Sequence, residues 1–301
     1  MGNEIPILIE NDSSIGYEKN ALGGILKLPL MWVLALWVAL KKKILGPNIK
    51  TNSFWFDGLS PICREVKDNA TNWKALDIIY NYCPKKTKGI VGFITNFWNG
   101  INNIKAVRNR FRLVKKIFKE KIQSLSKNQN PIRLVSIASG SAQVMIEVIK
   151  EFKERGIYVK VVFLDREPTA IKHSKKLANQ AGIIDQIQFV NKSTKDLEEV
   201  LSGFKPHIVE VTGLLEYRPD DKATNLLKRI YKLLASGGIV ITSNISPTPE
   251  SFFSYWVANW PMIYRDIERL SEIIIKAGFN PQNCKIIREP LKIHNVAVCK
   301  K

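Results

Sequence analysis

Hydrophobic and polar positions alternate regularly after residue 131. Short apolar runs predict strands over 132–138, 159–164, 187–190, 207–212, 238–243, 284–289 and 293–299. Segments with apolar positions every three to four residues predict helices over 142–155, 168–181, 195–202, 221–235 and 266–277. This alternation predicts an α/β fold with a mostly parallel, seven-stranded sheet and helices on both faces. Only a short turn separates the last two strands, so they should pair as an antiparallel hairpin.

Residues 1–130 have a different pattern, which predicts helices without strands. Residues 1–20 are polar, and we expect them to be loosely ordered. Apolar residues at helical spacing predict a helix over 60–82 and a basic helix over 105–121. The glycine- and asparagine-broken segment 89–103 indicates a lid or a second surface helix.

The apolar run at 28–40 reads LPLMWVLALWVAL, and Lys41, Lys42 and Lys43 follow it. A bilayer core needs about 20 apolar residues, so this run is short for a span. Three interpretations stay open: an interfacial membrane helix, a helix packed on the core, and a membrane span. The tryptophans in the run and the lysines after it are typical of a membrane interface.

The chain is strongly basic, with a net charge of +19. Residues 1–130 contain 21 Lys and Arg against 9 Asp and Glu, so the excess is concentrated there. Such a surface attracts nucleic acid, anionic lipid or an acidic substrate. The basic helix over 105–121 is interpreted either as a solvated face with an apolar stripe toward the core or as a contact with an anionic surface.

The polar segment 124–131 is the best candidate for a domain boundary. We therefore expect a helical region over 1–130 and an α/β domain over 131–301. The four cysteines are far apart and have no histidine at metal spacing, so we expect free thiols and no metal site. Free thiols and the absence of a basic leader favour a cytoplasmic protein, with peripheral contact at the inner face of the membrane as a further expectation.

The most informative stretch is 132–144, where a buried strand leads into small residues and then into an amphipathic helix. Small residues let a ligand approach the backbone, and a helix N-terminus offers free N–H groups. The next strand ends at Asp165, an acid that can accept hydrogen bonds from ribose hydroxyls. These features predict a nucleoside-binding half-domain. Only Gly140 matches the three glycines of a dinucleotide loop, which disfavours NAD.

Residues 132–300 resemble class I S-adenosylmethionine-dependent methyltransferases. The stretch 136–142 is similar to that family's D-x-G-x-G-x-G loop, 164–168 to its acid-tipped second strand, and 233–238 to its L-x-P-G-G turn. The resemblance implies a Rossmann-like fold with S-adenosylmethionine as cofactor. Residues 213–220 and 260–265 also resemble a bacterial subgroup, the methyltransferases of 3-hydroxy-fatty-acid methyl ester (extracellular factor) synthesis.

The resemblance implies a cofactor site at the carboxyl ends of the strands. Its expected residues are Ser136, Ala138, Ser139, Gly140, Ser141, Asp165, Arg166, Asn191, Lys192, Ser193, Thr212 and Gly213. Ser136 stands where the family has an acid, and alanines at 138 and 142 replace glycines. An inactive methyltransferase-fold binding protein therefore stays an alternative.

The residues that follow the fourth strand should border the transferred methyl group. A hydroxyl, amine or carbon acceptor needs a base, whereas a carboxylate does not. The candidate catalytic residues are Glu210, Tyr217 and Tyr264, with Glu216 as a further candidate near the site. Arg265 is interpreted as a bidentate contact for an anionic substrate or as an ion-pair partner of Asp266 or Glu268 at a helix N-terminus.

Two absent motifs narrow the acceptor. No [DN]-P-P-[YFW] follows the fourth strand, and no Pro-Cys nucleophile for C5 pyrimidine chemistry is present. Methylation of nucleobases is therefore disfavoured. We expect a small or amphiphilic, lipid-like acceptor and a membrane-facing N-terminal region. An RNA methyltransferase that grips phosphates with its basic helices is the alternative enzyme.

Overall fold

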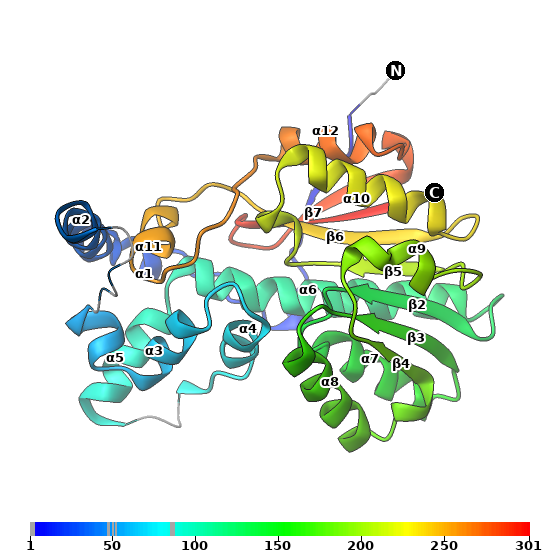
Figure 1. The fold of residues 1–301 in the computed structure, drawn as a ribbon, viewed down its shortest axis with the longest axis horizontal. Helices are drawn as coiled ribbons and strands as arrows, with labels where there is room; N and C mark the ends of the chain where they lie inside the picture. The colour runs from blue at the N-terminus through cyan, green and yellow to red at the C-terminus, as the bar shows by residue number, and fades with distance from the viewer. Residues whose placement is uncertain (1–3, 47–48, 50, 52, 85–87) are drawn as a thin grey trace.

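An eight-stranded sheet forms the centre of the computed structural model, which describes residues 4–46, 49, 51, 53–84 and 88–301 (Figure 1). The strands are β1 (Ile7–Ile9), β2 (Ile132–Ile137), β3 (Val159–Leu164), β4 (Ile187–Val190), β5 (Ile208–Val211), β6 (Ile239–Ile245), β7 (Cys284–Arg288) and β8 (His294–Lys300). Their order is β1-β7-β8-β6-β5-β2-β3-β4, and only β8 runs antiparallel to its neighbours. The mostly parallel sheet and the closing hairpin are confirmed.

The predicted count of seven strands is wrong because β1 adds an eighth. Ile7 to Ile9 pair in parallel with Ile286 to Arg288 of β7. The backbone N–H of Glu10 extends this pairing by donating to the carbonyl of Arg288 at 2.9 Å. The start of the chain is therefore tied to the sheet, although we expected it to be loose. A strand of three residues is too short for its periodicity to be recognised.

Helices cover both faces of the sheet, as predicted. One face is covered by α6 (Asn102–Leu125), α7 (Gln143–Glu154) and α8 (Pro168–Gln180). The other is covered by α9 (Leu197–Val200), α10 (Asp220–Leu233) and α12 (Ile267–Lys276). The predicted helices at 142–155, 168–181, 221–235 and 266–277 agree with the structure to within two residues at each end.

A third apolar cluster lies at one end of the molecule. It is formed by α2 (Leu28–Leu45), α3 (Pro61–Asp68), α4 (Trp73–Tyr80), α5 (Gly89–Asn99) and α11 (Ser251–Trp256). The short helix α1 (Leu22–Ile25) precedes α2 and contacts α6. We call α2–α5 and α11 the helical cap. The single helix predicted over 60–82 is two helices, because the chain turns between them and Thr71 has a φ of +67°. No helix in the described residues is long and apolar enough to cross a membrane.

Helix α6 connects the cap to the sheet. It is longer than the predicted basic helix, and its apolar residues Leu113, Ile117 and Ile122 are buried against the sheet. The apolar stripe therefore faces the core, as one of the two interpretations expected. The partly exposed cations beside it form ion pairs with acids of this chain. Lys115 pairs with Glu147 at 2.6 Å, and Arg108 pairs with Glu18 at 2.6 Å.

Candidate functional site

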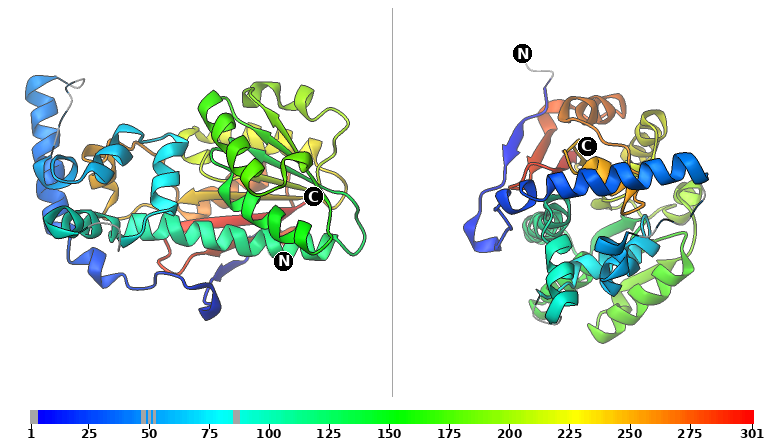
Figure 2. Two further views of the ribbon diagram at one scale, coloured as in Figure 1. Left: turned by 90° about the horizontal axis from the view of Figure 1, so that it is seen from below. Right: turned by 90° about the vertical axis from the view of Figure 1, so that its left-hand side faces the viewer.

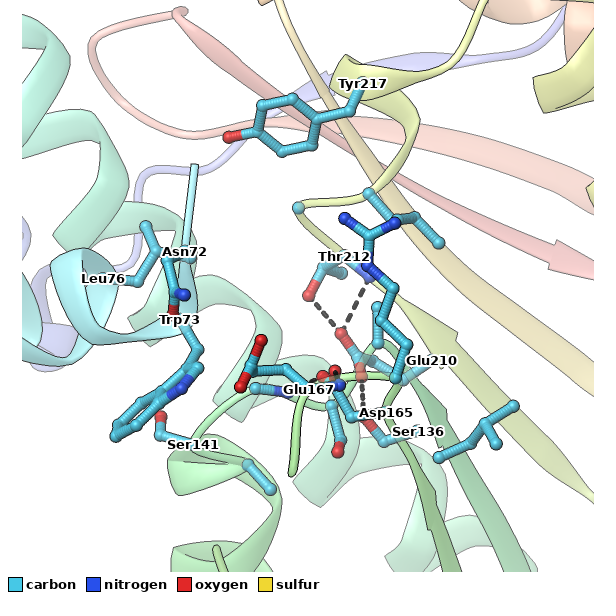
Figure 3. Close-up of a pocket in the computed structure, with 18 of the residues that line it drawn as sticks. Asn72, Trp73, Leu76, Ser136, Ser141, Asp165, Glu167, Glu210, Thr212 and Tyr217 are labelled. Atoms are coloured by element: carbon cyan, nitrogen blue, oxygen red, sulfur yellow. Dashed lines mark hydrogen bonds between the residues drawn. The ribbon is translucent and has the colours of Figure 1, made fainter. Parts of the chain in front are cut away.

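A cavity of about 730 Å³ lies at the carboxyl ends of β2, β3 and β5, a volume typical of sites for small molecules. In the sheet, β2 lies between β3, the next strand in the sequence, and β5. The strand order reverses at this point, which is where α/β sheets bind ligands. Residues of α4 and α6 form the opposite wall. Figure 3 shows Trp73 and Leu76 of α4 facing Glu210 and Thr212 across the cavity.

The loop from β2 to α7 forms the floor of the cavity. Ala138, Gly140 and Ala142 all have positive φ, between +52° and +55°. Glycine adopts this conformation without strain, whereas alanine does not. Ala142 is also the N-cap of α7, and no side chain caps that helix end. The Ser139 hydroxyl is buried and has no hydrogen-bond partner among the described residues, which leaves it available to a ligand.

Asp165 lies directly beside this loop, as the sequence predicts. Its Oδ2 accepts a hydrogen bond from the backbone N–H of Gly140 at 2.8 Å, and its Oδ1 accepts one from the N–H of Glu167 at 2.9 Å. The carboxylate therefore orders both the loop and the end of β3. Each carboxylate oxygen can accept a second hydrogen bond, so the group can still bind a hydroxyl in the cavity.

Glu210 supplies a carboxylate next to the position where the acid of the first strand is missing. Ser136 and Glu210 are paired across β2 and β5, and the Ser136 hydroxyl donates to Glu210 Oε2. The backbone N–H of Thr212 donates to the other carboxylate oxygen at 2.9 Å, and the Thr212 hydroxyl also donates to it. Burial raises the pKa of Glu210, and these hydrogen bonds offset part of the rise.

Arg110 of α6 is a site residue that sequence reasoning did not single out. Its side chain lines the cavity but is only 5% exposed, and its Nη2 donates to the Tyr80 hydroxyl at 3.0 Å. Its Nη1 lies 3.7 Å from the buried carboxylate of Glu216. A Cβ built on Gly213 would lie 3.6 Å from both Arg110 terminal nitrogens, so the cation borders the loop after β5. Burial lowers the pKa of Arg110, but Tyr80 and Glu216 outweigh this effect and hold the pKa above its ordinary value.

The structure brings most of the predicted cofactor residues to this cavity. Eleven of the twelve line it: Ser136, Ala138, Ser139, Gly140, Ser141, Asp165, Arg166, Lys192, Ser193, Thr212 and Gly213. Asn191 is not in the lining. Its side-chain N–H donates to the backbone carbonyl of Asp165 at 3.0 Å, so it supports the loop that carries the acid.

The candidate catalytic tyrosines differ in position. Tyr217 lines the cavity, and its hydroxyl accepts a hydrogen bond from the indole of Trp260 at 2.6 Å. Burial raises the pKa of Tyr217, which keeps the phenol protonated and unsuited to act as a base. Tyr264 lies outside the cavity lining and packs against a small cluster that contains Ala106 and Ile245.

Arg265 does not face the cavity. Its side chain is buried, and its Nε donates to Asp220 at 2.8 Å. Its Nη1 donates to the carbonyl of Leu215 and to the side chain of Asn244, both at 2.9 Å. The guanidinium therefore holds the loop after β5 in place. The prediction that Arg265 contacts the substrate is wrong. Arg265 does form an ion pair, but the predicted partners, Asp266 and Glu268, are wrong, because the guanidinium reaches Asp220 at the start of α10.

Comparisons with known proteins agree with this architecture. A family model described as "Putative methyltransferase" matches residues 36–301. The ubiquinone/menaquinone biosynthesis C-methyltransferase UbiE of Rickettsia felis is 25% identical over 142 residues, which are 47% of this chain and 54% of that protein. The match thus spans about half the length of that curated relative.

Two solved structures are similar over almost the whole chain. A possible exported protein from Bordetella parapertussis has a TM-score of 0.64 at 14% identity, over 97% of this chain and 99% of that one. The pyocyanin biosynthetic protein PhzM has a TM-score of 0.51 at 13% identity, over 96% of this chain and 76% of that one.

The strand order, the closing hairpin and the cavity at the switch point define a Rossmann-like fold of the class I methyltransferase type. Because the family model covers most of its length, the chain belongs to this family of methyltransferases.

Proposed function

We propose that this protein transfers a methyl group from S-adenosylmethionine to the carboxylate of an amphiphilic acceptor. The observation that carries the proposal is the buried cation of Arg110 in an otherwise largely apolar wall, beside the loop after β5. The resemblance of residues 213–220 and 260–265 to methyltransferases of fatty-acid methyl ester synthesis supports the same acceptor class.

The floor of the cavity fits the cofactor. The loop at 138–142 approaches a ligand closely, and the unpaired Ser139 hydroxyl is available to it. Asp165 would bind the ribose hydroxyls. Glu210 would take the place of the missing acid and face the cationic methionine end. When bound, S-adenosylmethionine supplies a methyl group on a positively charged sulfur, which a nucleophile can take in line.

The wall formed by α4 and α6 fits an acceptor with an apolar tail and a negative head. Its apolar lining residues are Leu76, Phe111, Val114 and Phe118. Among the described residues, Arg110 donates one hydrogen bond, to Tyr80, and lies 3.7 Å from Glu216, so its guanidinium has further N–H groups that can hold a carboxylate through charge-assisted bonds. Ionised side chains in the lining are mostly cations, which favours an anionic acceptor.

A carboxylate acceptor also suits the acid–base groups of the cavity. Glu210 already accepts three hydrogen bonds, and Tyr217 has a raised pKa, so neither is a ready general base. A carboxylate oxygen has no proton to lose. It forms the new bond to the methyl carbon, the carbon–sulfur bond breaks, and its electron pair stays on sulfur. The chain has only to position the two reactants.

Cofactor binding is tested by calorimetry of the full chain with S-adenosylhomocysteine. Replacing Asp165→Ala should weaken binding by about 1–3 kcal/mol, because hydrogen bonds to a charged acceptor are lost. Asp185→Ala, which removes an exposed acid beyond the C-terminal end of α8, serves as the matched control. A wild-type chain that binds neither S-adenosylhomocysteine nor S-adenosylmethionine would support the inactive binding protein instead.

Acceptor choice is tested by transfer of a labelled methyl group to long-chain fatty acids. A methyl ester releases labelled methanol in mild base, whereas a methyl ether, amine or carbon-bound methyl group does not. Because Arg110 is paired with Glu216, the double variant Arg110→Gln, Glu216→Gln removes the cation without leaving a buried charge unpaired. We expect it to bind S-adenosylhomocysteine normally and to lose ester formation by about 100-fold or more. Label that enters RNA alone, or only base-stable products, would contradict the proposal.

A further inference from the structure

Helix α2 has an apolar face on each side. Its inner face packs into the helical cap, where Met31, Leu34, Ala35 and Val38 are buried. Its outer face is also apolar: Val33, Leu36 and Ile44 are 63%, 61% and 70% exposed, respectively. Leu30, Val33, Trp37, Leu40 and Ile44 recur at alternating spacings of three and four residues. Leu36 is three residues after Val33 and four before Leu40, so it extends the same face, and we call these six residues the outer stripe.

This outer stripe lies at the surface of the molecule. In the right-hand view of Figure 2, α2 runs across the near end with its length fully in view. A surface helix of a protein in water normally has a polar outer face, and a helix that is apolar all round is covered by something else. Isolated exposed leucines need no explanation, but a contiguous apolar stripe along a whole helix indicates an interaction surface.

The residues that flank the stripe in the sequence carry charge of one sign. Residues 19–56 contain lysines but neither aspartate nor glutamate. Lys41 lies over the ring of Trp37, with its Nζ 4.0 Å from the ring centroid. Within the described part of the chain, Lys41, Lys42 and Lys43 form no ion pair. By contrast, the cations of α6 are largely paired with acids of this chain.

An apolar stripe can be covered by a second copy of the chain or by a membrane, and the flanking charge distinguishes between these two. In a two-fold dimer the same surface meets itself, so the lysines of each α2 would face a surface that also lacks acids. An anionic bilayer offers both partners at once, because its acyl region takes the apolar stripe and its headgroups take the lysines. An amphipathic helix bound in this way lies in the plane of the interface and does not cross the membrane.

We propose that α2 is a membrane-docking helix that lies on an anionic lipid surface, with its outer stripe inserted and Lys41 to Lys43 at the headgroups. The proposal does not depend on the acceptor or on the cofactor, because it rests on a surface away from the cavity.

The test is flotation of the full chain with vesicles of phosphatidylcholine, with and without about one third phosphatidylglycerol. We expect binding to the anionic vesicles that falls as salt is added. The variant Leu36→Gln, Leu40→Gln should lower the bound-to-free ratio about tenfold or more, and Lys42→Gln, Lys43→Gln should do so about tenfold. All four positions are on the outer half of α2, and thermal unfolding checks that the variants stay folded.

Matched controls lie on other elements. Ile184→Gln, Ile275→Gln replaces two apolar residues that are 36% and 37% exposed, and Lys175→Gln, Lys176→Gln removes two exposed lysines of α8. Neither control should change flotation. The proposal is overturned if the wild-type chain does not float with anionic vesicles, or if the α2 variants and their controls behave alike. It also fails if sedimentation shows a dimer that Leu36→Gln, Leu40→Gln dissociates, because a second copy then covers the stripe.

Discussion

At the scale of single residues, the loop after β2 has a carboxyl group beside it that comes from the neighbouring strand β5. Ser136 lacks the carboxylate that methyltransferases have at this point, but Glu210 is its partner in the ladder between β2 and β5. The serine hydroxyl donates to that carboxylate. A carboxyl group therefore remains at the floor of the cavity, although it belongs to a different strand. Under the proposed function, Glu210 would take the place of the missing acid.

The two alanines of the loop have a strained backbone conformation. Ala138 and Ala142 have φ values of +55° and +52°, where a Cβ is unfavourable by roughly 1–2 kcal/mol. We expect Ala142→Gly to raise the free energy of unfolding by about 0.5–1 kcal/mol, since glycine removes this strain at some cost in chain entropy. Chemical denaturation measures the change.

The control for this substitution is Ala223→Gly in α10, a buried alanine with helical neighbours. Glycine in a helix interior is less favourable than alanine by about 1 kcal/mol, so this variant should be less stable than the wild type. Equal losses in both variants would mean that the positive φ of Ala142 carries no strain.

The site was only partly predictable because some of its residues are assembled by packing. Asp165 and the loop at 138–142 are adjacent to strand ends in the sequence, so the α/β pattern alone predicts that they meet. Arg110 gave no such signal, since it is one of many cations on a basic helix. Its role follows from its burial beside Tyr80 and Glu216, which come from distant segments.

At the scale of elements, local periodicity predicted the strands and helices of the α/β region and the hairpin that closes it. It failed where an element is short or depends on a distant partner. β1 has three residues, and α11 has six. The predicted helix over 60–82 has helical spacing throughout, but the turn at Thr71 divides it. The alternatives for 28–40 also could not be separated, because both faces of α2 have the same composition.

Shortening a side chain to alanine should change the free energy of unfolding differently on the two faces of α2. Met31→Ala removes a fully buried side chain of the helical cap and should lower the free energy of unfolding by about 2–5 kcal/mol. Leu36→Ala on the outer stripe should change it by no more than about 0.5 kcal/mol. Denaturant unfolding in the absence of lipid compares the two. A large loss for Leu36→Ala would mean that the outer stripe is covered by protein in solution.

At the scale of the whole molecule, a buried acid makes the free energy of unfolding depend on pH. Burial raises the pKa of Glu216, although Arg110 and Arg265 lower it in part. The folded protein therefore holds this proton more tightly than the unfolded chain does. Its contribution to stability is complete below the ordinary carboxyl pKa of 4.5 and is lost as the pH rises through the pKa of the folded state.

Glu216→Gln removes this dependence. Between the two pKa values, the unfolding free energy of the variant relative to the wild type should rise by about 1.4 kcal/mol per pH unit. Urea unfolding at several pH values from about 4.5 to about 8 measures the difference. A difference that stays constant over that range would show that the carboxyl is ionised as readily in the folded protein as in the unfolded chain.

The pairing of β1 with β7 has a consequence for synthesis. β1 leaves the ribosome before β7, and its residue Ile7 pairs with the distant residue Ile286. The backbone groups of β1 that bond to β7 have no partner until β7 has been synthesised. This edge of the sheet therefore forms only after β7 has left the ribosome. A nascent chain that ends before β7 cannot form it.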